Sequence, residues 1–322
     1  MKSKNRKVLI GLTYGDPASI GPEILLKTIK SWKYRFSPVI IGNKEILSKN
    51  LKNLKSKIIF CEIVKEQKKS FVPGKPDKYS GIHSYLCLKQ AVSLANKSGI
   101  KALITGPVSK KHINLGGYRF FGQTDEMAKF SGINPKNVIM LFVANDLRIA
   151  LFTRHIPLRS VSEELNRKKL YDFIVLLNRE IKKHFKIKNP KIGILGLNPH
   201  ASENGTFGDE EEKIIKPVVD KLNTSGLKIY GPLSPDATLA KAGQHYLKNK
   251  KQSYDVYVSF YHDQALPMFK AVCGLKGVNV TLGLPFLRVS VDHGTAFDIA
   301  GKNIASNEGL ISAIKFVVKT LR

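Results

Sequence analysis

The sequence predicts an α/β protein built on mainly parallel β-sheet. Short apolar runs of strand length alternate along the chain with longer amphipathic stretches of helix length. Strands separated by helices are joined by right-handed crossovers, so they run parallel and are covered on both faces. Glycine- and proline-rich turns, and three of the eight histidines, follow predicted strands. Open α/β sheets bind ligands at this carboxyl edge of their strands, and we expect the functional site there.

The alternation of elements continues from residue 8 to residue 261. Pro22 suits the first turn of a helix, because no backbone N–H is needed there. A long amphipathic helix is expected from about Ser162 to Phe185, and the lysine- and proline-rich segment 65–78 is expected to be a surface excursion. The predicted strands are 8–14, 37–41, 101–105, 138–144, 147–153, 191–197 and 254–261, and the other predicted helices are 22–32, 81–98 and 125–130.

The length and composition allow one large domain or two ordinary ones with a real apolar core. Of the 322 residues 43% are hydrophobic, yet no stretch approaches the roughly 18 consecutive apolar residues of a membrane span. The basic start, Met1 to Lys7, leads into a predicted strand without the cleavage pattern of a signal peptide. Cys61, Cys87 and Cys273 form no CxxC pair, which fits a reducing compartment. We expect a cytoplasmic protein with no membrane partner.

The net charge of +28 raises the question of nucleic acid binding, because basic surfaces attract phosphate backbones. Basic residues occur along the whole chain, for example at 49–57, 182–191 and 248–251, and not in one stripe interleaved with aromatic side chains. This distribution is typical of a solvated, lysine-rich surface. We therefore expect no nucleic acid partner and an anionic small-molecule substrate. A non-catalytic basic protein that binds phosphate ligands or nucleic acid is the alternative.

Three histidines come directly after predicted strands. His155 follows the run 147–153, His200 follows 191–197 and His262 follows 254–261. Imidazole is a common ligand of divalent metal ions. Because the strand ends share one edge of the sheet, the pattern predicts that these side chains converge on one metal. Histidine is also common in loops, so three unrelated polar loop residues are the other interpretation.

Glycine- and proline-rich turns mark three of the connections that follow strands. They are the segments 15–23, 106–110 and 231–236, and their glycines would let the backbone approach a ligand closely. Each of them alone could be merely a structural turn. None is the GxGxxG fingerprint of a dinucleotide-binding fold, and the chain has no Walker loop. A nucleotide cofactor would therefore need another kind of binding loop.

Several segments together resemble the 4-hydroxythreonine-4-phosphate dehydrogenase (PdxA) family of pyridoxal phosphate, or vitamin B6, biosynthesis. They occur in the family's order over nearly the whole chain, as 15–23, 105–110, 196–201, 261–264 and 278–302. The resemblance implies that NAD, with NADP as a second candidate, oxidises the secondary hydroxyl of 4-phosphohydroxy-L-threonine. The resulting 3-keto acid loses carbon dioxide to give 3-amino-2-oxopropyl phosphate. The alternative is a paralogue that oxidises another four-carbon phosphorylated acid, such as erythronate 4-phosphate.

The family's metal-ligating histidines match His155, His200 and His262. The resemblance implies that a divalent cation (Zn, Mg or Co) binds there and lowers the pKa of the substrate hydroxyl. Three protein ligands leave coordination positions open, as in catalytic sites. The resemblance also implies a homodimer in which one subunit lends a histidine to the metal site of the other. Asp263 and Asp292 are candidates to orient the histidines or the substrate ammonium group.

The resemblance assigns the contacts with the phosphorylated substrate to five residues. They are Gln123, Thr124, Lys270, Asn279 and Arg288, and Lys270 joins the three histidines in the catalytic set. Arg288 offers a planar fork for an oxyanion, and its apolar surroundings in the sequence would demand an anionic partner if it is buried. The chain reads Gly-Gln-Thr-Asp where the family usually has Gly-His-Thr-Glu, and glutamine cannot become a cation.

A second departure from the family lies after His200, where Ser202 and Asn204 replace glycines. We expect this loop to be slightly reshaped, because asparagine tolerates left-handed backbone better than serine does.

The segment 292–302 resembles a loop of isocitrate and isopropylmalate dehydrogenases that holds the adenosine half of the dinucleotide. By this resemblance the NAD contacts fall on His293, Gly294, Thr295, Ala296 and Asp298, although His293 could instead be a packed core residue. The same analogy implies two α/β/α domains with mainly parallel sheets flanking a cleft. Residues 1–125 plus 277–322 would carry both termini and the cofactor loop, and 126–276 the metal ligands and dimer contacts.

Overall fold

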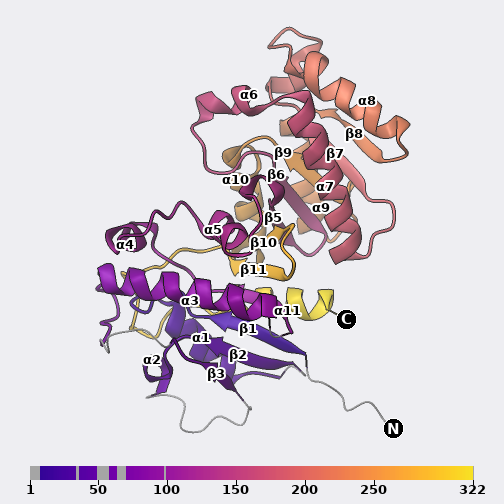
Figure 1. Cartoon of the computed structure of the whole chain (residues 1–322). Helices are drawn as coiled ribbons and strands as arrows, with labels where there is room; N and C mark the ends of the chain where they lie inside the picture. Colours follow the sequence, from indigo (N-terminus) through magenta and orange to yellow (C-terminus); the bar gives the residue numbers. More distant parts are fainter. Residues whose placement is uncertain (1–7, 34–35, 49–57, 64–69, 98, 322) are drawn as a thin grey trace. The chain divides into compact units, whose positions relative to one another are not determined.

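A computed structural model of the chain describes residues 8–33, 36–48, 58–63, 70–97 and 99–321 (Figure 1). The chain folds as two compact units. Unit 1 combines Met1–Val138 with Leu284–Arg322, and unit 2 is Ile139–Gly283. Strands alternate with helices in both units and most strand pairs are parallel, so the predicted fold class is confirmed.

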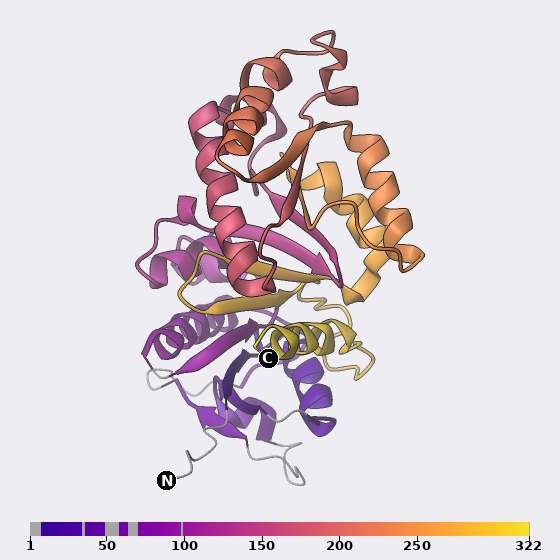
Figure 2. The same ribbon diagram turned by 90° about the vertical axis from the view of Figure 1, so that its right-hand side faces the viewer.

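The described strands of unit 1 form a parallel sheet in the order β3-β2-β1-β4-β11. The strands are β1 (Leu9–Thr13), β2 (Ser37–Ile41), β3 (Ile59–Cys61), β4 (Ile100–Thr105) and β11 (Leu287–Val291). The helices are α1 (Gly21–Lys30), α2 (Lys44–Ser48), α3 (Lys78–Lys97), α4 (Lys110–Leu115), α5 (Gln123–Phe130), the 3-10 turn η1 (Pro135–Asn137) and α11 (Glu308–Thr320). Helix α3 lies on one side of the sheet, and α1 and α11 lie on the other (Figure 2). Both faces are therefore covered, and β11 is buried throughout.

The described strands of unit 2 follow the order β10-β5-β6-β9-β7-β8. The pairs β10–β5 and β5–β6 are antiparallel, and β6, β9, β7 and β8 run parallel. The strands are β5 (Ile139–Ala144), β6 (Leu147–Leu151), β7 (Lys191–Leu195), β8 (Lys228–Leu233), β9 (Val256–Ser259) and β10 (Val278–Leu282). The helices are η2 (Leu158–Ser160), α6 (Val161–Glu164), α7 (Arg167–Phe185), η3 (Pro199–Glu203), the π-helical turn η4 (Glu211–Ile215), α8 (Lys216–Thr224), α9 (Pro235–Leu247), α10 (His262–Cys273) and η5 (Gly274–Lys276). Figure 2 shows α7 and α9 on opposite sides of this sheet.

The limits of the units differ from the divisions predicted after residues 125 and 276. Helix α5 packs into the core of unit 1, where Met127 and Ala128 belong to the same buried apolar cluster as Leu88 of α3. Strand β10 pairs with β5 of unit 2 over its whole length. The compact units therefore divide directly before β5 and just after β10.

The predicted helix 162–185 is wrong in one respect, because it is two helices, α6 and α7. The Asn166 backbone is extended, and its side-chain oxygen accepts a hydrogen bond from Lys169 N–H at 2.9 Å. Asparagine favours this position because its side chain satisfies an N–H that has no partner in the first turn. Within the part of the chain that the structure describes, no helix combines the length and apolar character needed to cross a bilayer.

The predicted surface excursion 65–78 can be judged only in part, because residues 65–69 lie outside the described residues. Gly74 N–H donates to the Ala18 carbonyl at 2.8 Å, and the Phe71 ring lies 5.2 Å from the His83 ring. This segment thus contacts the turn after β1 through Gly74 and helix α3 through Phe71. This segment supports the carboxyl edge of the unit 1 sheet.

Candidate functional site

His155 and His262 lie together at the carboxyl ends of two neighbouring parallel strands, β6 and β9. The strands are in register at Leu151 and Ser259, and their pairing is extended by Thr153 N–H, which donates to the Phe260 carbonyl at 3.1 Å. The two imidazole centroids are 5.5 Å apart, with an angle of 39° between the rings. His262 Nδ1 is 2.5 Å from Asp263 Oδ1. That carboxylate fixes the orientation of the ring and directs Nε2 elsewhere, as in the carboxylate–histidine pairs of metal sites.

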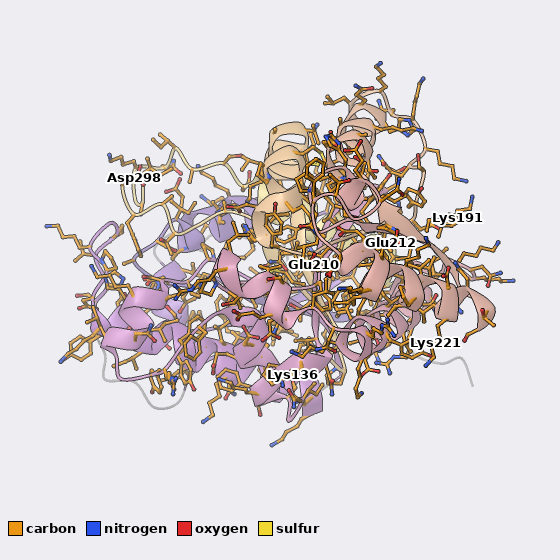
Figure 3. The ribbon with its side chains drawn as sticks, turned by 90° about the horizontal axis from the view of Figure 1, so that it is seen from above. Lys136, Lys191, Glu210, Glu212, Lys221 and Asp298 are labelled. Atoms are coloured by element: carbon orange, nitrogen blue, oxygen red, sulfur yellow. The ribbon has the colours of Figure 1, made fainter. Side chains whose placement is uncertain are left out.

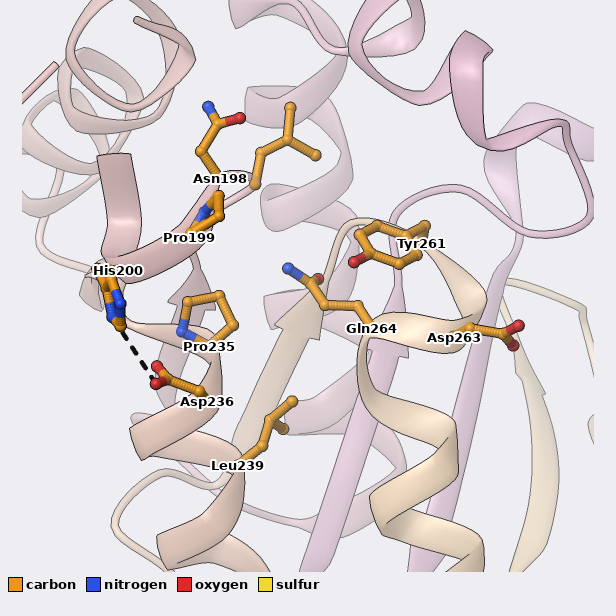
Figure 4. A pocket seen from close by; sticks show the side chains of 10 residues that line it. Asn198, Pro199, His200, Pro235, Asp236, Leu239, Tyr261, Asp263 and Gln264 are labelled. Carbon is orange, nitrogen blue, oxygen red and sulfur yellow. Dashed lines mark ion pairs between the residues drawn. The ribbon is translucent and has the colours of Figure 1, made fainter. Parts of the chain in front are cut away.

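His200 follows β7, the strand on the other side of β9, so the three histidine loops leave adjacent strands. Its side chain is 60% exposed, and its Nδ1 is 3.7 Å from Asp236 Oδ2 (Figure 4). Among the described residues of a single chain, no group of three or more His, Cys, Asp or Glu side chains has the arrangement of a metal site. One chain thus brings His155 and His262 together but not all three histidines.

His200 lines a pocket of about 370 Å³ in unit 2, and Asp236, Asp263 and Gln264 also line it (Figure 4). Gln264 joins two strand ends behind this pocket, because its Nε2 donates to the Gly196 carbonyl at 2.7 Å while its Oε1 accepts from Phe260 N–H at 2.7 Å. Gln264 belongs to the segment 261–264 that resembles the family, but no role was predicted for it. Its position directly after a predicted strand was the available signal.

Lys270 and Asn279 are the other predicted site residues of unit 2. Lys270 lies in the last turn of α10 and is exposed. Asn279 lies in β10, and its side-chain oxygen is buried with no hydrogen-bond partner among the described residues. A buried acceptor without a donor is costly, so this oxygen is suited to an N–H or O–H group of a ligand.

Arg288 is the largest fully buried side chain that the structure describes in unit 1, with 1% of its surface exposed. Its Nη2 donates to Thr105 Oγ1 at 2.8 Å and to Gln123 Oε1 at 2.9 Å. Both acceptors are uncharged. Burial lowers the pKa of Arg288 to about 9, so the guanidinium is still a cation at pH 7. A cation in such surroundings favours the approach of an anion.

Gln123 uses both ends of its amide inside unit 1. Its oxygen accepts from Arg288, and its Nε2 donates to the Gly106 carbonyl at 3.1 Å. Gln123 therefore joins β11 to the turn after β4, a role that no local sequence pattern indicates. Thr124, the next residue, is buried.

Glycines allow close backbone contacts at the turns after β1 and β4. A Cβ on Gly15 would lie 2.0 Å from the Pro107 carbonyl oxygen, and one on Gly21 would lie 1.7 Å from that of Tyr14. Asp16 is fully buried between these turns, where Ala18 N–H and the Ser80 hydroxyl donate to its carboxylate. Burial raises the pKa of Asp16, and these hydrogen bonds oppose that rise.

The predicted cofactor loop, 293–298, lies beside the turn after β1. Ile20 N–H donates to the Thr295 carbonyl at 3.1 Å. The Nε2 atom of His293 is buried without a hydrogen-bond partner among the described residues, while Gly294 and Asp298 are exposed (Figure 3 labels Asp298). A glycine with open space around it and an imidazole nitrogen without a partner fit a loop that receives a polar ligand.

The charged side chains are spread over the surface. In unit 2, Lys191 and Lys221 lie at separate places (Figure 3), and the exposed Glu212 pairs with Lys216. This agrees with the even distribution of lysine along the sequence.

Comparison with known proteins gives matches along nearly the whole chain. The family model described as "Pyridoxal phosphate biosynthetic protein PdxA" matches residues 34–317. A protein of a Sulfurihydrogenibium species named 4-hydroxythreonine-4-phosphate dehydrogenase is 40% identical over 97% of this chain and 98% of its own. A protein of Pectobacterium atrosepticum named D-threonate 4-phosphate dehydrogenase is 33% identical over 97% of this chain and 98% of its own.

Solved structures agree with these matches. The crystal structure of 4-hydroxythreonine-4-phosphate dehydrogenase from Klebsiella pneumoniae is 28% identical, with a TM-score of 0.82 over 98% of this chain and 100% of that chain. Isocitrate dehydrogenase from Methylococcus capsulatus, at 11% identity and a TM-score of 0.50 over 98% of this chain and 86% of that chain, shares the fold alone. The chain therefore belongs to the family of the pyridoxal phosphate biosynthetic protein PdxA.

Proposed function

We propose that this chain is a 4-hydroxythreonine-4-phosphate dehydrogenase that acts in pyridoxal phosphate biosynthesis. It oxidises the secondary hydroxyl of 4-phosphohydroxy-L-threonine with NAD, and the 3-keto acid decarboxylates to 3-amino-2-oxopropyl phosphate. The observation that carries the proposal is the pair His155 and His262 at adjacent strand ends, in a chain that matches dehydrogenases of that name over nearly its full length.

The donor chemistry of unit 2 fits a divalent cation, which is Zn, Mg or Co in this proposal. His155 and His262 offer two neighbouring imidazoles, and Asp263 already orients one of them. Since one chain does not group His200 with this pair, the proposal includes a homodimer in which His200 of the partner subunit completes the set. When bound, the cation lowers the pKa of the substrate hydroxyl and stabilises the developing alkoxide.

The remaining predicted residues bind and orient the substrate and cofactor. Arg288 holds an oxyanion of the substrate with its planar fork, and Lys270 adds a compact positive charge. Asn279 accepts a hydrogen bond from a substrate N–H or O–H group through its buried oxygen. The loop 293–298 holds the adenosine half of NAD, and NAD supplies the hydride acceptor.

The compartment and the other partners complete the proposal. The three cysteines are free, which accords with a cytoplasmic protein. The spread of charge supports a small anionic substrate and no nucleic acid partner.

The direct test is NADH production by the purified protein with a divalent cation and 4-phosphohydroxy-L-threonine. We expect turnover that a chelator stops and added metal restores, and turnover with D-threonate 4-phosphate is the comparison for substrate choice. Unaltered turnover in excess chelator would overturn the metal role. Salt-sensitive retention of DNA without any NADH signal would favour the binding-only alternative.

Mixed dimers test whether the metal ligands are shared between subunits. The variants His200→Ala and His262→Ala are each expected to be inactive. In their 1:1 mixture, half of the dimers are mixed and each mixed dimer has one intact site, so we expect about one quarter of the wild-type activity. An inactive mixture, with subunit exchange verified by mass spectrometry, would place all three histidines in one chain.

A further inference from the structure

The loop that carries His200 has an unusual backbone. Five consecutive residues, none of them glycine, have positive φ angles: His200 (51°), Ala201 (55°), Ser202 (64°), Glu203 (46°) and Asn204 (57°). Residues with side chains visit this left-handed region rarely, and they remain there only where the surroundings hold them. The position of the His200 imidazole therefore depends on whatever holds this loop.

A buried carboxylate, that of Glu211, meets the start of the loop. Glu211 has no exposed surface. Its Oε1 accepts hydrogen bonds from Leu197 N–H at 2.7 Å and Asn198 N–H at 2.8 Å, and its Oε2 accepts from Asn198 Nδ2 at 2.9 Å. These donors come directly before Pro199 and His200. One side chain thus fixes two successive backbone N–H groups at the point where the chain enters the left-handed run.

Close packing leaves the carboxylate and the loop little freedom. A Cβ on Gly196 would lie 2.7 Å from Ala201 Cα and 3.1 Å from Glu211 Oε1, so the loop folds back onto the end of β7. Ser202 is fully buried, and its hydroxyl accepts from Gly205 N–H at 3.1 Å. Glu211 itself begins the π-helical turn η4. Such turns are rare overall, but many of those that occur lie at functional sites.

We propose that Glu211 is a positioning residue for His200: its carboxylate holds Leu197 and Asn198 so that the left-handed loop presents the imidazole for metal binding. The proposal rests on the proposed function, in which His200 is a metal ligand. It assigns a role to a residue that contacts the start of the His200 loop and is not among the proposed ligands of the substrate or the cation. Groups that orient metal ligands typically change metal affinity or activity by about 10- to 100-fold when they are removed.

The test compares Glu211→Ala and Glu211→Gln with Glu212→Gln in the full-length protein. Glu212, which Figure 3 labels, is the matched control, because it is the next glutamate in the chain but is exposed and pairs with Lys216. Co²⁺ is the probe, since its visible absorption reports both affinity and ligand geometry. Hydrogen exchange of the Leu197 and Asn198 amides reports the loop directly, without metal or substrate.

We expect Glu211→Ala to weaken Co²⁺ binding by about 10- to 100-fold, to change the absorption band and to lower kcat with little change in the KM for NAD. Glu211→Gln keeps one oxygen for the two backbone N–H groups but sets an NH₂ group against Asn198 Nδ2, so an intermediate effect is expected. Amide exchange at Leu197 and Asn198 should become faster in the same order. Glu212→Gln should match the wild type in all of these measurements.

Several results would overturn the proposal. If both Glu211 variants kept wild-type Co²⁺ affinity, absorption and amide exchange, Glu211 would not position the loop. A lower melting temperature with unchanged Co²⁺ binding would reduce its role to stability. If Glu211→Ala does not fold, the nearly isosteric Glu211→Gln variant decides. Failure of the proposed function is separate, because His200→Ala would then leave Co²⁺ binding unchanged, and amide exchange would still show whether Glu211 holds the loop.

Discussion

The turn after β1 in unit 1 and the loop after β7 in unit 2 both carry predicted functional segments at the carboxyl end of a strand, but they are held in different ways. In unit 1, the glycines Gly15 and Gly21 let backbone touch backbone, with no room for a Cβ. In unit 2, residues with side chains adopt left-handed backbone, and the Glu211 carboxylate holds them. An added side-chain atom should therefore disrupt the turn after β1, whereas loss of the Glu211 acceptor should disrupt the loop after β7.

One buried carboxyl group in each unit, Asp16 and Glu180, provides a second comparison, because their pKa values shift in opposite directions. Burial raises the pKa of Asp16 in unit 1. Burial would also raise the pKa of Glu180 in unit 2, but hydrogen bonds from His184 and Arg179 and the charge of Lys183 outweigh it and lower that pKa to about 2. The surroundings of Glu180 therefore favour its ionised form, whereas those of Asp16 disfavour it.

The largest expected effect is that of Gly21→Ala in unit 1. The new Cβ would lie 1.7 Å from the Tyr14 carbonyl oxygen, so the backbone must move. We expect a loss of about 3 kcal/mol or more in the free energy of unfolding, measured by urea denaturation. Gly122→Ala is the control, because nothing lies within 4 Å of its Cβ position and its φ is extended. Equal stability of the two variants would show that the glycine contact is unimportant.

The next largest effect is expected at Glu180 of unit 2, whose contribution to stability should depend on pH. Because the folded pKa of Glu180 lies near 2, below its ordinary value of 4.5, the ionised group stabilises unit 2 above pH 4.5, and this contribution is lost as the pH falls toward 2. The shift corresponds to about 3 kcal/mol at neutral pH. Glu180→Gln should therefore be much less stable than the wild type at pH 7, and the difference should shrink between pH 4.5 and 2.

Asp16→Asn should show the opposite pH trend. Because the folded pKa of Asp16 is raised above 3.8, its favourable contribution is present below that pH and is lost as the pH rises through the folded pKa. Relative to the wild type, the variant should fare better at pH 7 than at pH 3. The same direction of pH dependence in both variants would contradict this comparison of the units.

A smaller effect is expected at Gln123, which accepts a hydrogen bond from Arg288. Gln123→Met keeps the approximate size of the side chain but removes the acceptor for Nη2 and the donor to Gly106. Loss of such a hydrogen bond to a charged group costs about 1.5–3 kcal/mol, so KM for the phosphorylated substrate should rise by roughly 10-fold or more while kcat changes little. Thr105→Val, which removes one acceptor with little change of shape, should have a weaker effect. Unchanged KM in both variants would separate Arg288 from substrate binding.

The smallest expected effect is a gain in stability from Ala201→Gly in unit 2. Alanine at φ 55° is strained, and glycine relieves that strain at the cost of a more flexible unfolded chain. We expect an increase of about 0.5–1 kcal/mol in the free energy of unfolding. Asn204→Gly should gain less, because asparagine tolerates this conformation. A loss of stability on Ala201→Gly would mean that the packing of the Ala201 methyl group outweighs the strain.

The sequence predicted the elements well because their signals are local. The strand 37–41 is found with the same bounds, and β1, β4 and β6 lie within the predicted strands or one residue from them. The helix 162–185 failed at Asn166, where a cap competes with the helical pattern. A helix cap depends on one side chain, so its signal is easily missed where the amphipathic pattern continues across it.

The site was predictable only in part, because side-chain contacts cross large sequence distances. His155 and His262 meet because β6 and β9 are neighbours, although two further strands, β7 and β8, come between them in the chain. The bridge from Arg288 to Gln123 joins residues 165 positions apart, and no local pattern indicates it. For Glu211, the replaced glycines after His200 signalled an unusual loop, but the residue that compensates for them comes later in the sequence.

The three histidines lie in loops that follow the strands and not in the strands themselves, so their positions can change without a change in the sheet. Each histidine comes a few residues after its strand ends. An insertion or deletion in one loop would therefore move one imidazole, while the pairing of β6, β9 and β7 kept its register. If the proposed metal site is present, the choice of cation could then be changed through the length of a single connection, with little loss of stability in the sheet.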